Sequence, residues 1–165
     1  MPARPLVLFP DPRLRQPAAE VTEFGADLQA LAGDLSDTLA AVGAIGLTAP
    51  HIGVLARIMA VRLEPGTETR LYVNPRLTRT SAELEIHEEG SVSMPGMREN
   101  IGRPAEIAFA YQDLSGDERQ VMAMGWEAAV LQHEIDQLDG VFWIDRLSRL
   151  KRDRLVKRYA KLGRG

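Results

Sequence analysis

The sequence predicts an α+β fold in a single domain that spans residues 1–165. Three observations favour this class: an amphipathic helical segment comes first, a group of strand-like segments follows it, and two more helical segments end the chain. Strands that are grouped in this way, instead of alternating with helices, are typical of α+β proteins. A chain of 165 residues is also long enough to bury a core without help from disulfides.

The helices are predicted from apolar residues that recur every three or four positions. Five such residues share one face of the segment 26–42, and the glycines of "VGAIGLTAPHIG" then end the helix and open a tight loop. A core helix is expected from about Trp126 to Leu138, stopped near Gly140. The last helix is expected to begin at about Leu147.

The strands are predicted between the first helix and the core helix. Segments 56–63 and 71–77 are each typical of a strand, and "EIAFAYQDL" and "ERQVMAM" flank the turn sequence 115–117 as the two arms of a hairpin. We expect mixed or antiparallel strands that pack around the core helix.

The composition indicates an ordinary globular protein, with 45% hydrophobic and 26% charged residues. The chain has no cysteine, which excludes disulfides and thiolate metal sites. Pro10 and Pro12 break the short apolar run near the N-terminus, so this run is typical neither of a signal peptide nor of a membrane span. We therefore expect a cytoplasmic protein without a membrane partner.

The charges are unevenly distributed along the chain. Residues 145–165 hold nine Lys or Arg against two Asp, whereas the rest of the chain holds 11 basic and 21 acidic residues. A basic tail on an acidic body is typical of a docking surface for an anionic partner.

One face of the core helix carries the residues with chemical potential. At offsets of 3, 4, 7 and 11 residues, this face holds Trp126, Ala129, Val130, His133 and Gln137. Side chains four residues apart on a helix point at the same spot, which is the spacing that metal-binding helices use for two histidines. Glu134 follows His133, where it is placed to handle the proton of a water molecule bound at that spot.

Three segments together resemble the signature motifs of the peptide deformylase family. "AIGLTAPHIG" (44–53), "HEEGSVSMPG" (87–96) and "LQHEIDQLDG" (131–140) are similar, in order and spacing, to G-I-G-L-A-A-P-Q, E-G-C-L-S and H-E-x-D-H. The likeness continues through "FPDPRLRQPAAEV" and "GVFWIDRLSRLKRDRL", and so covers essentially the whole chain. The resemblance implies a peptide deformylase-like fold and a reaction that removes the formyl group from N-terminal methionine with a divalent metal (iron, zinc, nickel or cobalt).

The resemblance also implies a role for each matching position. The metal ligands of the family match Ser91, His133 and Gln137, and its catalytic glutamate matches Glu134. His51 matches the glutamine that helps to hold the formyl oxygen, and the backbone amide of Val92 is the second donor. The positions that bind substrate, either by pairing with it as an added strand or by lining the methionine pocket, match Ile45, Gly46, His87, Glu89, Gly90, Trp126, Ala129 and Val130.

The substituted ligand positions indicate that no metal cofactor is expected. A serine hydroxyl stays neutral near pH 7, and a glutamine oxygen suits hard cations better than zinc or iron. Without the metal, hydroxide is harder to form by about 12 kcal/mol, from a pKa near 15.7 instead of about 7. A carboxylate base such as Glu134 supplies only about 3–5 kcal/mol.

The sequence leaves three arrangements open. In the first, Ser91 and Gln137 are polar fillers that hydrogen-bond to each other, to His133 or to water. In the second, the metal centre is rebuilt from His51, His133 and the Gln137 oxygen. In the third, Ser91 acts as a nucleophile with His133 as its base. The third arrangement lacks an acid that is evidently placed in the sequence to orient the imidazole.

The function that follows is a peptide deformylase-like protein with a degraded metal site, weakly active or inactive, that binds N-terminal formyl-methionyl peptides. The alternative is an active metal-dependent hydrolase with a rebuilt centre, which removes formyl or a similar acyl group. The basic C-terminal helix resembles the segment by which bacterial deformylases dock on the ribosome, so the expected partners are peptide N-termini and the ribosome.

Overall fold

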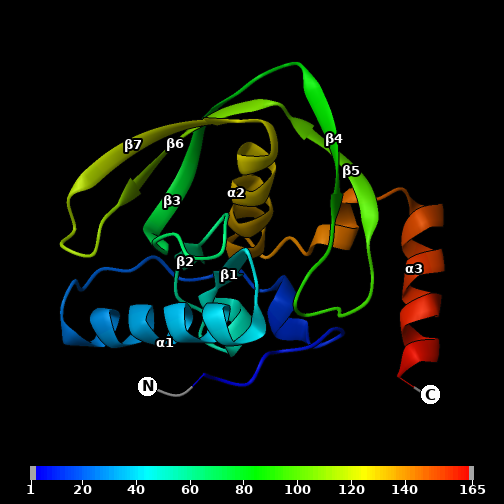
Figure 1. Ribbon diagram of the computed structural model, residues 1–165, viewed down its shortest axis with the longest axis horizontal. Coiled ribbons are helices and arrows are strands. Elements are labelled where there is room, and N and C mark those ends of the chain that lie inside the picture. The colour runs from blue at the N-terminus through cyan, green and yellow to red at the C-terminus, as the bar shows by residue number, and fades with distance from the viewer. Residues whose placement is uncertain (1–2, 164–165) are drawn as a thin grey trace.

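The computed structural model describes residues 3–163 and confirms the α+β class (Figure 1). The helices are α1 (Ala26–Val42), α2 (Gly125–Leu138) and α3 (Arg149–Leu162). The strands are β1 (Gly46–Thr48), β2 (Ile58–Val61), β3 (Arg70–Thr80), β4 (Leu84–Glu89), β5 (Glu99–Pro104), β6 (Glu106–Gln112) and β7 (Glu118–Met124). Figure 1 shows α2 upright near the centre, α1 lying below it and α3 at one side.

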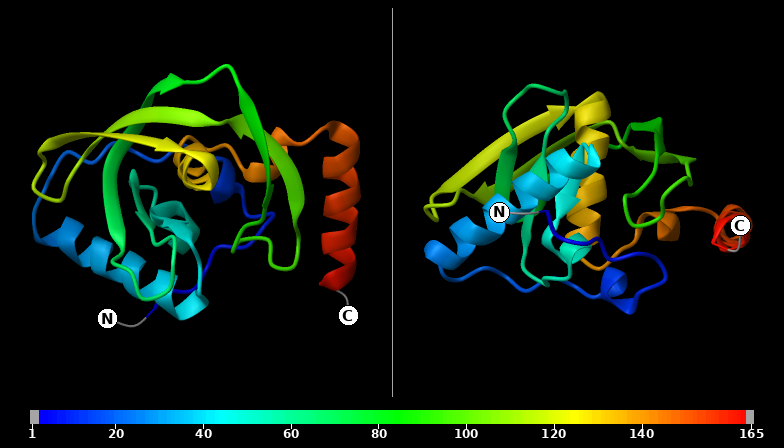
Figure 2. Two further views of the ribbon diagram at one scale, coloured as in Figure 1. Left: turned by 45° about the horizontal axis from the view of Figure 1, so that its top comes forward. Right: turned by 60° about the horizontal axis from the view of Figure 1, so that its bottom comes forward.

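The strands form two antiparallel sheets. Five strands pair in the order β1-β2-β3-β6-β7, and β4 pairs with β5 in a separate hairpin. Both views of Figure 2 show the long strands β3, β6 and β7 curving together on one side of the molecule. The predicted β6-β7 hairpin and the strands β2 and β3 are confirmed, whereas the β4-β5 hairpin was not predicted.

Helix α1 packs its apolar face against the short strands of the five-stranded sheet. Leu35 and Leu39 are fully buried against Leu47 of β1 and Ile58 of β2, and each such side chain stabilises the fold by about 1.5–3 kcal/mol. The helix ends where Gly43 adopts a left-handed conformation (φ +67°), which glycine adopts without a steric penalty. The sequence predicted a tight loop after this helix, and this prediction is wrong. The segment forms β1 and a 3-10 helix, Ala49–Ile52.

Helix α2 separates the core from the cavity described below. Its residues Leu131, Ile135 and Leu138 are buried in the cluster that contains Tyr72 and Phe109 of the sheet. This packing fixes the rotation of the helix, and the face that carries Ala129, Val130 and His133 therefore turns to the other side.

Helix α3 joins the body through a third apolar cluster. Leu155 is buried in it, and the Tyr159 ring contacts the Phe9 ring edge to face at 5.9 Å between centroids. The helix begins at Arg149 and not at Leu147, because the Ser148 hydroxyl caps it by accepting from the Lys151 amide. Within residues 3–163, no helix has the length and apolar character that crossing a membrane requires.

Candidate active site

A cavity of about 360 Å³ lies between the first turn after α1, the end of β4 and helix α2. Nearly all site residues that the sequence predicts line it. These are Ile45, Gly46, His51, His87, Glu89, Gly90, Ser91, Val92, Trp126, Ala129, Val130, His133 and Glu134. Gln137 is the exception, since it is buried but is not among the lining residues.

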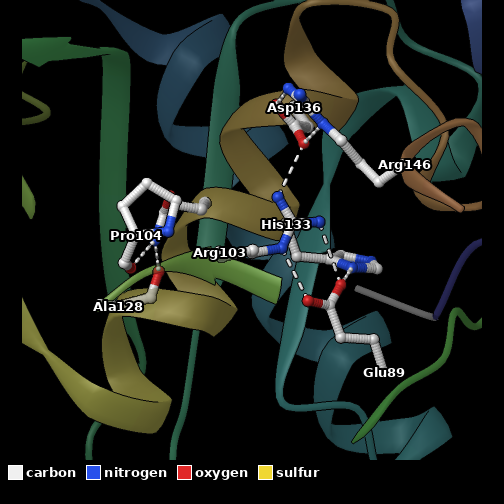
Figure 3. A network of polar contacts seen from close by, with 8 residues as sticks. Glu89, Arg103, Pro104, Ala128, His133, Asp136 and Arg146 are labelled. Atoms are coloured by element: carbon white, nitrogen blue, oxygen red, sulfur yellow. Dashed lines mark hydrogen bonds and ion pairs between the residues drawn. The ribbon is translucent and has the colours of Figure 1, made fainter. Parts of the chain in front are cut away.

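A buried network of charges holds His133 in place (Figure 3). The Nδ1 atom of His133 lies 2.7 Å from Oε1 of Glu89, at the end of β4. The guanidinium of Arg103, on β5, donates to both oxygens of the same carboxylate, at 2.6 and 3.0 Å. Arg103 and His133 outweigh the effect of burial and lower the pKa of Glu89.

The network continues away from the cavity. Arg103 donates to Asp136 at 2.8 Å, and Arg146 donates to both oxygens of Asp136 at 2.8 and 2.9 Å. Asp136 is the acid of the H-E-x-D pattern, and these bonds give it a structural role. Both buried carboxylates are fully paired, so the network ties α2 to the β4-β5 hairpin and to Arg146.

His133 itself carries opposing influences. Burial alone would lower its pKa, but the nearby carboxylates of Glu134 and Glu89 outweigh burial and raise it. Glu89 fixes the ring by accepting at Nδ1, which leaves Nε2 as the ring nitrogen available to the cavity. The sequence assigned Glu89 to the pocket wall; the structure places it on the wall with its carboxylate turned to Arg103 and His133.

His51 presents a hydrogen-bond donor without a partner. The backbone amide of Thr48 donates to Nδ1 of His51 at 2.9 Å, so Nδ1 bears no hydrogen and the neutral ring carries it on Nε2. This Nε2 atom is buried and has no hydrogen-bond partner in the described chain. Burial, with a smaller effect of His133, lowers the pKa of His51 to about 3, so the ring is neutral near pH 7.

Glu134 presents a buried carboxyl group to the same cavity. Its Oε1 atom has no hydrogen-bond partner in the described chain, and burial raises the pKa of the group. The carboxylate packs against the α-carbon of Gly46, where an added Cβ would lie 2.5 Å from Oε2.

The two substituted ligand positions make hydrogen bonds to other groups than expected. The Ser91 hydroxyl oxygen accepts from the Ser93 amide at 3.1 Å, and Gln137 Nε2 donates to the Leu14 carbonyl at 2.7 Å. No hydrogen bond joins Ser91, Gln137 and His133 to one another among residues 3–163. Ser91 and Gln137 are therefore polar fillers, but their hydrogen-bond partners are Ser93 and Leu14 and not each other or His133.

These donors do not fit a catalytic divalent metal. No cluster of three or more His, Cys, Asp or Glu side chains in the described chain is arranged to hold one. A catalytic zinc site needs three protein ligands beside its open position. Here Ser91 supplies a neutral hydroxyl, Gln137 supplies a neutral amide whose Nε2 bonds to the Leu14 carbonyl, and His133 alone offers an imidazole nitrogen among the three matching positions.

Sequence reasoning missed Arg103, which orders the charged network. The sequence pattern that could have identified it is an arginine in "NIGRP", inside a strand that was not predicted. It also missed Met97 and Arg98, which line the cavity beyond β4.

The comparisons with known proteins agree with the motifs. The polypeptide deformylase family matches residues 3–153. A peptide deformylase-like protein of Bradyrhizobium diazoefficiens is 50% identical over 165 residues, 100% of this chain and 97% of that protein. A peptide deformylase of Rhizobium meliloti is 40% identical over 164 residues, 98% of this chain and 94% of that protein.

Solved structures extend the likeness to three dimensions. The peptide deformylase of Ehrlichia chaffeensis in complex with actinonin superposes with a TM-score of 0.92 at 34% identity and covers 100% of both chains. With the fold, the three ordered motifs and these relatives in agreement, the chain belongs to the polypeptide deformylase family.

Proposed function

We propose that this protein binds the acylated N-terminus of an extended peptide, with formyl-methionine as the first residue, and that its metal-dependent deformylation is weak or absent. One observation carries the proposal. His51 Nε2–H and Glu134 Oε1 are buried polar atoms that have no partner within residues 3–163, and both residues line one cavity. Most buried polar groups in proteins are paired, so two unpartnered atoms whose residues line the same cavity point to a ligand.

The two atoms complement an N-acyl amide. The His51 N–H can donate to the carbonyl oxygen of the acyl group, and Glu134 can accept from the amide N–H of the first residue. A free ammonium group has no oxygen for His51 to bind. The cavity therefore supports preference for a formylated over an unformylated N-terminus.

The surrounding backbone supports an extended ligand. Strand β1 is an edge of the five-stranded sheet, paired with β2 alone, and its first residue, Gly46, lines the cavity. An exposed edge accepts a peptide as an added strand. Trp126, Ala129 and Val130 of α2 then provide an apolar wall for the first side chain.

The alternative is hydrolysis through a rebuilt centre of His51, His133 and Gln137. Gln137 is not among the residues that line the cavity, and its Nε2 is held by the Leu14 carbonyl, which disfavours the alternative. In the absence of a cation, the roughly 3–5 kcal/mol that a carboxylate base supplies does not replace the roughly 12 kcal/mol that a metal supplies in forming hydroxide.

The test is calorimetric titration of the protein with formyl-Met-Ala-Ser and with the same peptide lacking the formyl group. We expect the formylated peptide to bind at least about tenfold more tightly, or about 1.4 kcal/mol. Formate release is measured in parallel with added iron, nickel or zinc. Equal affinity for the two peptides contradicts the binding proposal, and rapid metal-dependent formate release contradicts the weak activity.

Two variants test whether the peptide binds in the cavity or elsewhere on the surface. Ala129→Leu places a larger side chain in the cavity and is expected to abolish binding. Ala160→Leu makes the same change on the exposed side of α3 and should bind as the unaltered protein does.

We further propose that this cytoplasmic protein docks on ribosomal RNA through α3. Leu155 and Tyr159 pack inward, whereas Arg154, Lys157 and Arg158 are exposed. A helix that packs one face on the body and leaves its cations in solvent is suited to a phosphate-rich surface.

A further inference from the structure

The Ser91 hydroxyl, the His133 imidazole and the Glu89 carboxylate line one cavity, and the last two make a contact that the amino-acid sequence alone did not reveal. The serine mechanism lacked an acid to orient His133. The structure supplies it, since Glu89 Oε1 lies 2.7 Å from His133 Nδ1. Arg103 fixes that carboxylate with two further hydrogen bonds, so Glu89 is held rigidly on the side of the ring away from Nε2.

Ser91 follows Gly90 just beyond β4 and lines the same cavity as His133. Its oxygen accepts a hydrogen bond from the Ser93 amide at 3.1 Å. Acceptance uses a lone pair and leaves the hydroxyl hydrogen free for a second partner. The structure shows no Ser91–His133 hydrogen bond, and bonds of this kind are often long in ligand-free sites and tighten when substrate binds.

Two N–H donors in the cavity are free to stabilise a negatively charged oxygen. The first is His51 Nε2–H, which is buried without a partner. The second is the backbone amide of Val92, the residue after Ser91, which donates to no acceptor within the described residues. A nucleophile followed by a free amide, with a second donor from the lining of the same cavity, supplies the two N–H groups that an oxyanion hole uses.

We propose that this site carries a metal-independent acyl-transfer activity in which Ser91 is the nucleophile, His133 the general base and Glu89 the positioning residue. The inference rests on the proposed function, because the acyl group must first enter the cavity. The substrates are small formyl or acetyl groups on an ester or an amide. Esters react faster, since an alkoxide or phenoxide leaves more readily than an amine.

The proposed reaction needs water as its only co-reactant. The Ser91 oxygen bonds to the acyl carbon while its hydrogen passes to His133 Nε2, and the acyl oxygen takes the negative charge opposite His51 and Val92. The bond from the acyl carbon to the leaving oxygen or nitrogen then breaks, and the leaving group takes the proton from His133. Water attacks the acyl-serine ester in the same way, which releases the carboxylic acid and restores the Ser91 hydroxyl.

The first test uses a fluorophosphonate probe on the full chain in excess EDTA, with the labelled residue located by mass spectrometry. We expect one adduct, on Ser91. Ser93→Ala is the matched control two residues away, and it should label like the unaltered protein, because the buried Ser93 hydroxyl has no hydrogen-bond partner to lose in the part of the chain that the structure describes. Ser91→Ala should not label. An unlabelled Ser91 in the unaltered protein overturns the inference, as does a label that persists in Ser91→Ala.

The second test follows p-nitrophenyl formate in EDTA. We expect a burst of about one equivalent of p-nitrophenol, the signature of an acyl-enzyme. Glu89→Gln should lower kcat roughly a hundredfold with KM unchanged, since it disturbs the orientation of His133 while a side chain of the same size keeps the cavity wall in place. A burst that survives in Ser91→Ala, or turnover that requires added metal, overturns the inference.

Peptide titration distinguishes the two proposals. A protein that binds formyl-Met-Ala-Ser but has an unreactive Ser91 retains the proposed function and loses this inference. A protein that binds neither the formylated nor the unformylated peptide loses both.

Discussion

Gly46 illustrates how a single hydrogen atom can be required in the cavity. A Cβ at this position would lie 2.5 Å from Glu134 Oε2 and 2.8 Å from two of its carbons. The carboxylate would have to move from its buried position, so we expect Gly46→Ala to lower the free energy of unfolding by about 1–3 kcal/mol. Binding of formyl-Met-Ala-Ser should weaken as well.

Gly33 provides the control for this prediction. It lies inside α1 with nothing within 4 Å of an added Cβ. Gly33→Ala should therefore stabilise the protein by about 1 kcal/mol through helix propensity alone. Urea denaturation measures both variants, and a Gly46→Ala protein as stable as the unaltered one contradicts the close packing against Glu134.

His51 gives a second prediction, which concerns how the stability of the fold changes in acid. Its pKa is lowered from 6.5 to about 3 in the folded protein, so the unfolded chain binds a proton between these values and the folded one does not. The contribution of His51 to stability is therefore complete above pH 6.5 and falls as the pH drops towards 3. At pH 4 the loss from this group is on the order of 3 kcal/mol.

The measurement compares the unaltered protein with His51→Gln, which keeps a side-chain N–H but does not titrate. Between pH 7 and pH 4, the urea midpoint should fall more for the unaltered protein than for His51→Gln. The additional loss of unfolding free energy should equal the amount assigned to His51. The difference isolates this residue, because other groups that titrate in acid, including Glu89, are present in both proteins. Parallel losses in the two proteins would mean that His51 is accessible to protons in the fold.

At the scale of elements, α3 has one face in the core and the other in solvent. We expect the double reversal Lys157→Glu and Arg158→Glu to reduce co-sedimentation with ribosomes at low salt at least about tenfold and to flatten its salt dependence, because each phosphate contact contributes to the slope. Peptide binding should not change, since neither residue lines the cavity.

The control for α3 places the same charge change elsewhere. Arg76→Glu and Arg79→Glu alter two exposed arginines of β3 and leave α3 intact. This variant should sediment with ribosomes nearly as well as the unaltered protein. An equal loss in both variants would attribute the binding to net charge, and no binding by the unaltered protein would remove the docking proposal.

The elements that the sequence predicted are those whose apolar pattern faces the core. Helices α1 and α2 have such a pattern, and their bounds were predicted closely. The hairpin β4-β5 was missed because its pattern is inverted. Leu84 and Ile86 face solvent, with 60% and 71% of their surface exposed, while Glu89 and Arg103 face inward. Because the charged residues of the site face inward on these strands, the hairpin lacks the apolar pattern by which a strand is predicted.

At the scale of the whole molecule, the motifs predicted which segments meet but not which atoms pair. Helical spacing places Gln137 on the face of His133, yet its partner is the Leu14 carbonyl, 123 residues earlier in the chain. The contact between His133 and Glu89 likewise joins residues 44 apart. Such pairings depend on the packing of distant segments, which a local pattern does not encode.

The same long-range contact bears on whether family ligands placed at the two substituted positions would hold a metal. Ser91→Cys with Gln137→His supplies a thiolate and a second imidazole, which with His133 make the three ligands of a catalytic site. The Leu14 carbonyl now bonds to Gln137, and a backbone carbonyl is also the usual partner that orients a metal-bound imidazole. We therefore expect the double variant to fold without a metal.

Zinc binding should then appear as added stability. At a free zinc concentration of about 100 times Kd, the free energy of unfolding should rise by about 2.7 kcal/mol, which thermal melting with zinc or with EDTA detects. Formate release from formyl-Met-Ala-Ser should appear with it, because Glu134 is retained beside the restored ligands. Ser91→Cys alone is the control and should gain much less, since one thiolate and one imidazole leave the ligand set incomplete. A double variant that binds zinc but releases no formate would mean that His51, or another residue that lines the cavity, has also diverged from the family reaction.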